Sequence, residues 1–196
     1  MIETVVRLLP AASRDAVAWK NGGGVTREIA CAPDGAGMDD FLWRASLAEV
    51  AADGPFSAFP GVDRTLTMVE GDGMELTVDG VATLVESPGE PRDFAGDVAT
   101  HCRLLGGRTV VNFNVMWRRD ALAAPPSVAV VRGRLPLAAH TSEVLVVALA
   151  AEGAELTAPD FGRSLGRYDA AVVRGGADLH AKGPVAVVTL DSRAAA

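Results

Sequence analysis

Arg64 and Asp63 follow a segment whose composition is typical of a rigid loop. The segment 54–61 holds two aromatic residues, two prolines and two glycines, and a β-type run begins directly after Arg64. The planar fork of an arginine matches the two oxygens of a carboxylate, and Asp63 is expected to hold that fork in place. The alternative is a surface ion pair, which contributes at most about 1 kcal/mol.

A second arginine, Arg44, belongs to an alternating run at 41–50. Successive side chains of a strand point to opposite faces, so Arg44 and Ser46 share one face and Trp43 lies on the other. The two polar residues can then line one wall of a pocket. An ordinary half-buried strand with a solvated arginine fits the pattern equally well.

Two amides share one face of the run at 110–117. Alternation places Asn112, Asn114 and Met116 together, with Phe113 and Val115 on the other face. Asparagine is disfavoured in strands, and burying its amide unpaired is costly. A polar pocket explains the pair; a strand end with solvated amides is the alternative.

Lys20 and Asn21 precede three consecutive glycines and a run that contains Thr26. Glycines let the backbone approach a ligand closely and present amide N–H groups to an anion. A nucleotide-binding P-loop is excluded, because it requires the lysine after the glycines and a helix behind it. A flexible turn is the simpler interpretation of this segment taken alone.

The remaining chemistry-bearing residues are scattered. His101, His140 and His180 are isolated in the sequence, and a Gly-x-Ser-x-Gly nucleophile motif is absent. Cys31 and Cys102 are far apart, and we predict two buried free thiols. We therefore predict no metal, no cofactor and no catalytic residues.

The elements that must position these residues are short strands. The predicted strands are 4–8, 25–31, 42–50, 65–70, 74–78, 81–85, 101–105, 110–117, 127–131, 143–149, 170–174 and 185–190. Short strands separated by turns favour a sandwich or barrel. Asp79-Gly80 predicts a hairpin and Gly106-Gly107 another turn, whereas Ser13 could cap a short helix over 14–18.

Length and charge limit the function further. The 196 residues suffice for one large β unit or two small ones, and the Ala- and Pro-rich segment 123–126 predicts a division into 1–122 and 127–196, packed as one compact body. The net charge of −7 opposes nucleic-acid binding. Because no signal peptide or long apolar run is apparent, we expect a cytoplasmic protein without membrane association.

Four segments together resemble the HutD/Ves family. They are Trp19-Lys20-Asn21-Gly22-Gly23-Gly24-Val25-Thr26-Arg27-Glu28-Ile29-Ala30, Trp43-Arg44-Ala45-Ser46, Gly54-Pro55-Phe56-Ser57 with Phe59-Pro60-Gly61-Val62-Asp63-Arg64, and Asn112-Phe113-Asn114-Val115-Met116 with Arg118-Arg119. The resemblance departs at Asn112, where the family commonly has Asp, and in a loose version of an aromatic, glycine and aspartate motif at 91–97.

The resemblance implies a mostly β, cupin-like (RmlC-type) bicupin of sandwich or barrel halves with few short helices. It also implies a bacterial cytosolic regulator of histidine utilisation that binds a pathway intermediate, with N-formylglutamate favoured and urocanate also considered. The family has no established catalytic activity, and Arg64 matches its suspected anion contact.

We predict a metal-independent protein that binds a small carboxylate. The predicted site consists of Lys20, Asn21, Thr26, Arg44, Ser46, Asp63, Arg64 and Asn114. The alternative is a metal-free isomerase or hydrolase acting on a sugar or amino-acid derivative, for which Glu28, Asp63 and His101 could supply acid and base. A structural or protein-partner role ranks third, and a homodimer is left open.

Overall fold

The computed structural model of the chain describes residues 3–87, 89–138 and 143–191. Strands make up nearly all of its regular structure, and the helical segments of these residues are two 3-10 turns, η1 (Ala11–Ser13) and η2 (Leu105–Gly107). The prediction of a mostly β fold with few short helices is confirmed. In the described residues, no helix is long and apolar enough to cross a membrane.

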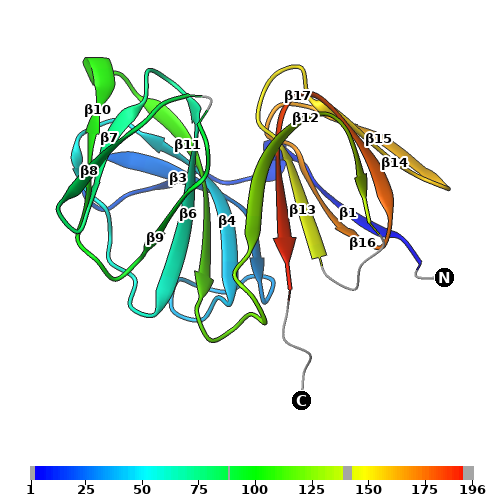
Figure 1. Cartoon of the computed structure of the whole chain (residues 1–196), viewed down its shortest axis with the longest axis horizontal. Coiled ribbons are helices and arrows are strands. Elements are labelled where there is room, and N and C mark those ends of the chain that lie inside the picture. Colours follow the sequence, from blue (N-terminus) through cyan, green and yellow to red (C-terminus); the bar gives the residue numbers. More distant parts are fainter. Residues whose placement is uncertain (1–2, 88, 139–142, 192–196) are drawn as a thin grey trace. The chain divides into compact units, whose positions relative to one another are not determined.

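The chain forms two compact units. One is Arg14–Ala121, and the other joins the N-terminal segment up to Ser13 to the chain from Leu122 onward. In Figure 1 the dark blue strand β1 accordingly lies among the yellow, orange and red strands. This division differs from the expected 1–122 and 127–196 at the N-terminus, because β1 (Val5–Leu9) pairs with β16 (Ala170–Arg174).

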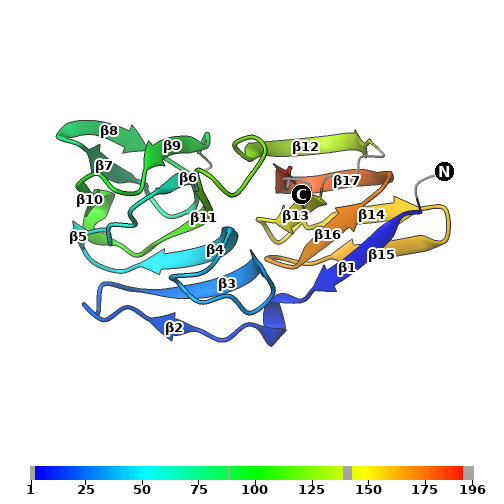
Figure 2. The same cartoon turned by 90° about the horizontal axis from the view of Figure 1, so that it is seen from below.

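The unit Arg14–Ala121 contains two antiparallel sheets. Its strands are β2 (Val17–Ala18), β3 (Gly24–Ala32), β4 (Trp43–Val50), β5 (Gly54–Pro55), β6 (Val62–Glu70), β7 (Met74–Val78), β8 (Val81–Val85), β9 (Arg92–Ala95), β10 (Thr100–Leu104) and β11 (Val110–Arg118). One sheet has the order β2-β3-β4-β11-β6-β9 and the other the order β5-β10-β7-β8. Figure 2 shows β2, β3 and β4 side by side in the larger sheet.

An apolar core contains side chains from both sheets of this unit. It contains Val50, Leu66, Met68, Met74, Leu76, Val85, Cys102, Leu104 and Val110. The predicted turns at Asp79-Gly80 and Gly106-Gly107 are confirmed, because all four residues have positive φ. The helix expected over 14–18 is wrong, since β-branched Val17 pairs instead with Thr26 of β3.

The other unit is built on one long strand. Its strands besides β1 and β16 are β12 (Ser127–Leu137), β13 (Glu143–Ala148), β14 (Ala154–Ala158), β15 (Phe161–Leu165) and β17 (Ala177–Leu190). Strand β17 pairs with β12, β13 and β14. Its buried cluster of fourteen residues consists entirely of Leu, Val and Ala, so this cluster offers no polar group to a ligand.

Candidate functional site

A cavity of about 480 Å³ opens on the inner face of the larger sheet of the unit Arg14–Ala121. It is lined by Val17, Ala18, Trp19, Lys20, Asn21, Thr26, Met38, Arg44, Ser46, Ala48, Pro55, Phe56, Ser57, Phe59, Arg64, Asn112, Asn114 and Met116. Seven of the eight residues predicted for the site line this cavity, and Asp63 does not.

Strand register brings the polar residues together on three neighbouring strands. Asn114 on β11 lies opposite Ser46 on β4, and Met116 lies between Arg44 on one side and Arg64 on the other. Side chains directly opposite each other share a face of the sheet. The predicted alternation of β4 and β11 is thus confirmed, and it places Arg44, Ser46 and Asn114 in one cavity.

Arg64 is the most unusual side chain of the cavity. The residue is 8% exposed, and its Nε atom is buried without a hydrogen-bond partner. In the described ranges, no acceptor or carboxylate is found within bonding distance of its guanidinium. Burial lowers the pKa of Arg64 to about 10, so the group remains charged at neutral pH.

Three phenylalanine rings surround this guanidinium. The Cζ atom of Arg64 lies 5.2 Å, 5.6 Å and 5.1 Å from the ring centroids of Phe56, Phe59 and Phe94. Phe94 is the residue directly opposite Arg64 on β9. Cation–π contacts stabilise the charge but supply no hydrogen-bond acceptor, so the N–H groups remain available to an anion.

Two amides of β11 add unsatisfied groups to the same cavity. Asn112 is 2% exposed with a buried, unpaired Nδ2, and Asn114 is 6% exposed with a buried, unpaired Oδ1. Buried polar groups without partners are rare in folded proteins and call for an explanation. Asn112 is not among the residues predicted for the site, although its position two residues before Asn114 places both amides on the same face of the strand.

Arg44 differs from Arg64 because it already has a counter-ion. Its Nε atom lies 3.0 Å from Oε2 of Glu28 in an ion pair, and its guanidinium also contacts the sulfur of Met38. The other carboxylate oxygen of Glu28 accepts from the thiol of Cys31 at 3.4 Å. Burial and the negative charge of Glu28 raise the pKa of the Cys31 thiol, so Cys31 is a neutral donor at physiological pH.

A hairpin carries Lys20, Asn21 and Thr26 to the cavity. Its ends are joined by the bond from the amide N of Trp19 to the carbonyl of Gly24, at 2.9 Å. The indole N–H of Trp19 donates to the hydroxyl of Thr26 over 2.7 Å, and the side chain of Asn21 accepts from the amide of Gly23 at 3.0 Å. These bonds hold exposed Lys20 at the edge of the cavity.

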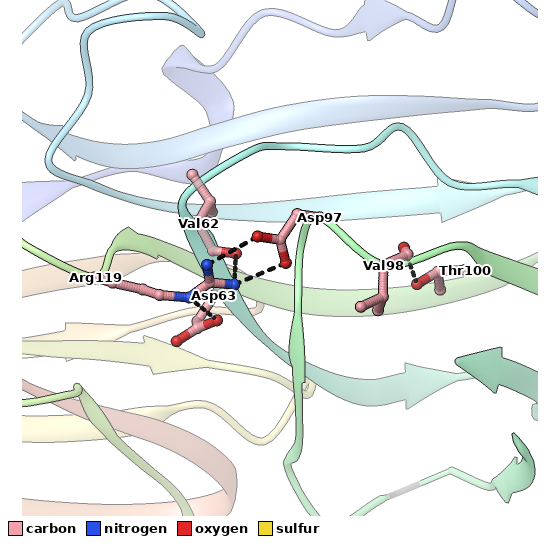
Figure 3. Close-up of polar contacts among 6 residues, drawn as sticks. All are labelled: Val62, Asp63, Asp97, Val98, Thr100 and Arg119. Carbon is pink, nitrogen blue, oxygen red and sulfur yellow. Dashed lines mark hydrogen bonds and ion pairs between the residues drawn. The ribbon is translucent and has the colours of Figure 1, made fainter. Parts of the chain in front are cut away.

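The expected support of Arg64 by Asp63 is wrong. Adjacent residues of β6 point to opposite faces of the sheet, so Asp63 faces away from the cavity. Its carboxylate instead accepts from Nε of Arg119 over 2.8 Å, and both oxygens of Asp97 accept from the other two guanidinium nitrogens, also at 2.8 Å. Figure 3 shows Arg119 held between the two carboxylates.

The Asp63–Arg119–Asp97 cluster fixes the loop that carries one ring of the Arg64 site. Gly96, next to Asp97, donates to the carbonyl of Val62 and accepts from the amide of Phe59, both at 2.7 Å. The two carboxylates raise the pKa of Arg119, and the guanidinium lowers the pKa of Asp97 to about 2. The cluster therefore positions Phe59 without touching the cavity itself.

This cluster predicts a specific response to acid. The pKa of Asp97 is depressed from 3.8 to about 2 in the folded protein, so its stabilising contribution is complete above pH 4 and is lost as the pH falls toward 2. In Asp97→Asn, the free energy of unfolding from urea denaturation should decline less steeply across this window than in wild type. The exposed Asp15→Asn variant is the control; identical curves for Asp97→Asn and wild type would contradict the prediction.

Of the described histidines and cysteines, none lines the cavity. His101 lies on β10 and His180 on β17 in the other unit, while His140 lies outside the described residues. Within the ranges that the structure describes, no three His, Cys, Asp or Glu side chains form a group that could hold a metal ion. Cys31 and Cys102 are both buried and free.

Comparison with known proteins agrees with the site motifs. The family model named HutD matches residues 11–189. A Pseudomonas putida protein described as an uncharacterized 21.2 kDa protein in the hutC 3' region is 40% identical over 112 residues, which is 57% of this chain and 58% of that protein. Protein Ves of Citrobacter koseri is 42% identical over 113 residues, 57% of each chain.

A solved structure named HutD shares the fold of this chain, and this likeness confirms the predicted cupin-like architecture. HutD from Pseudomonas fluorescens SBW25 has a TM-score of 0.84 at 29% identity, covering 97% of this chain and all of that chain. The sequence match, by contrast, spans somewhat under two thirds of the curated relatives' length. The family model covers nearly the whole sequence, and the structural match covers 97% of the chain. The chain therefore belongs to the HutD/Ves family.

Proposed function

We propose that this chain binds a small carboxylate in the cavity, with Arg64 as the principal contact. The observation that carries the proposal is the buried guanidinium, which has three aromatic neighbours and no acceptor among the described residues. A carboxylate that accepts from this guanidinium supplies both the missing acceptors and the missing negative charge. A cavity of about 480 Å³ lies within the range of small-molecule sites.

The unpaired amides support a ligand with further polar groups. Asn112 offers a donor and Asn114 an acceptor on the face that carries Arg64, and Ser46 adds a buried hydroxyl opposite Asn114. A bound ligand that pairs these atoms removes the penalty of leaving them buried without partners. Lys20 adds a positive charge at the edge of the cavity.

We propose further that the ligand is an intermediate of histidine utilisation, such as N-formylglutamate or urocanate, and that the protein acts as a regulator in the bacterial cytoplasm. Membership of the HutD/Ves family and the hutC-region relative support this assignment. Both compounds carry a carboxylate and a group that can form hydrogen bonds with an amide.

Binding is favoured over catalysis by the placement of the candidate acids and bases. Asp63 is bound to Arg119 on the other face of the sheet. His101 is exposed and lies on the opposite face of β10 from the buried residues Thr100 and Cys102. Among the described residues that line the cavity, none is Asp, Glu, His or Cys. Glu28 stands beside the cavity but is bound to Arg44 and Cys31.

Titration calorimetry with N-formylglutamate, urocanate and glutamate tests the proposal. We expect at least one of them to bind with a dissociation constant below about 1 mM. It should also raise the melting temperature, by an amount that grows with the logarithm of the ratio of its concentration to its dissociation constant. The diamide of N-formylglutamate, which is uncharged, is the control, because it lacks the anion that Arg64 requires. If no carboxylate of this panel binds, the proposed ligand class is wrong.

A further inference from the structure

The wall next to Arg64 carries a positive charge that is already compensated. The side chain of Arg44 is 15% exposed and forms an ion pair with Glu28 at 3.0 Å. Arg64 lies on the same face of the sheet, beyond Met116, and has no such counter-ion among the described residues. The cavity wall thus contains two guanidinium groups, of which one is neutralised and one is not.

Glu28 is held in this position by the geometry of β3. Glu28 lies opposite Ser46, on the cavity face, and the bulge between Glu28 and Ala30 brings Cys31 opposite Arg44 on the same face. One of its oxygens is bound by Arg44 and the other by Cys31. Because both oxygens are engaged, the carboxylate has a fixed place beside the ligand site.

We propose that Glu28 is a specificity-determining residue, which acts through Arg44 and limits this wall to one ligand carboxylate. The inference rests on the carboxylate function proposed above. A ligand carboxylate at Arg64 meets an uncompensated positive charge, whereas a second carboxylate near Arg44 meets the negative charge of Glu28 as well. Charges in a partly buried wall are only weakly screened. The preferred ligands therefore carry a carboxylate toward Arg64 and a neutral hydrogen-bonding group toward Arg44.

N-formylglutamate and N-formylglutamine form the matched pair of probes, since they differ only in a carboxylate and an amide. Calorimetry should show that Glu28→Gln strengthens the binding of N-formylglutamate roughly tenfold and changes that of N-formylglutamine less than about twofold. Glu49→Gln is the control: it removes the same charge from the same sheet, but from an ion pair with Arg27 on the opposite face. In Glu49→Gln, the ratio of the dissociation constants of N-formylglutamate and N-formylglutamine should equal the ratio in wild type.

Arg44→Gln provides a second, opposite test if Glu28→Gln does not fold. It leaves the charge of Glu28 uncompensated, so the dicarboxylate should lose more affinity than its amide. If a folded variant binds both probes and the ratio of their dissociation constants is unchanged from wild type, the inference about Glu28 is overturned. The proposal of carboxylate binding would still stand in that case. If neither wild type nor the variants bind either compound, the proposed carboxylate function fails, and this inference fails with it.

Discussion

Replacing Arg64 with methionine should abolish carboxylate binding and raise the thermal stability of the ligand-free protein. Burial lowers the pKa of Arg64 from its ordinary value to about 10, which corresponds to a penalty of about 3 kcal/mol on the charged form. Because the folded-state pKa is the lower one, this penalty is present at every pH below about 10 and is relieved only above it. Anion binding offsets the penalty, and methionine removes it.

The stability gained in Arg64→Met is smaller than the burial penalty of Arg64, because the substitution also removes the favourable contacts between the guanidinium and the three rings. Each ring contact of the guanidinium contributes about 0.5–2 kcal/mol, and the thioether of methionine replaces part of that through contacts with the same three rings. We expect a gain of about 1–2 kcal/mol, hence a melting temperature a few degrees higher. Differential scanning calorimetry near pH 7 measures this shift, and titration calorimetry measures the loss of binding.

Arg64→Lys separates the charge from the shape of the group. Lysine keeps a positive charge but loses the fork that binds two oxygens. A charge-assisted hydrogen bond contributes about 1.5–3 kcal/mol, so affinity should fall roughly ten- to hundredfold.

Arg103→Met is the matched control for Arg64→Met, because Arg103 is an exposed arginine of the same unit, paired with Glu75. An Arg64→Met protein that melts below wild type and still binds the ligand would contradict the assignment of the site.

The strand faces of the site could be predicted from the sequence, whereas the pairing of the strands could not. Alternation along 41–50 and 110–117 correctly places Arg44, Ser46 and Asn114 on cavity faces. Alternation is a local property with a period of two residues. That Asn114 lies opposite Ser46, and Arg64 opposite Phe94, depends on register between segments far apart in the chain.

The error at Asp63 has the same physical origin. Proximity in sequence suggested that Asp63 supports Arg64, but neighbours in a strand cannot share a face. The partner of Asp63 is Arg119, which is 56 residues away. Applying the alternation rule to this pair, as it was applied to Arg44 and Ser46, would have separated the two residues.

Five strands were not predicted: β2, β5, β9, β14 and β15. All but β14 (Ala154–Ala158) are short or polar. Strands β2, β5 and β9 have two to four residues, which is too few to show a period. Strand β15 contains Gly162, Arg163 and Ser164, which disfavour a strand on composition. These strands form because neighbouring strands offer pairing partners, an effect of tertiary structure that overrides local preference.

Gly24→Ala should destabilise the protein and weaken ligand binding, although it adds a single methyl group. A Cβ atom at Gly24 would lie 2.4 Å from the carbonyl oxygen of Glu49 and 3.1 Å from the indole ring of Trp19. The carbonyl belongs to the paired strand β4 and cannot retreat without disturbing the ladder between β3 and β4. Overpacking of this kind costs about 1–3 kcal/mol.

Gly23→Ala is the matched control, because it places the same methyl group one residue earlier in the hairpin. Its Cβ would lie 3.3 Å from the side-chain oxygen of Asn21, a contact that a shift of a few tenths of an ångström relieves without moving Asn21 out of the cavity. Displacement of Trp19 in Gly24→Ala should carry Lys20 and Asn21 away from the cavity, because the backbone bond from Trp19 to Gly24 joins the ends of that hairpin. Urea denaturation and calorimetry should therefore show reduced stability and affinity for Gly24→Ala and near wild-type values for Gly23→Ala. Equal effects of the two substitutions would mean that close packing at Gly24 does not position the hairpin.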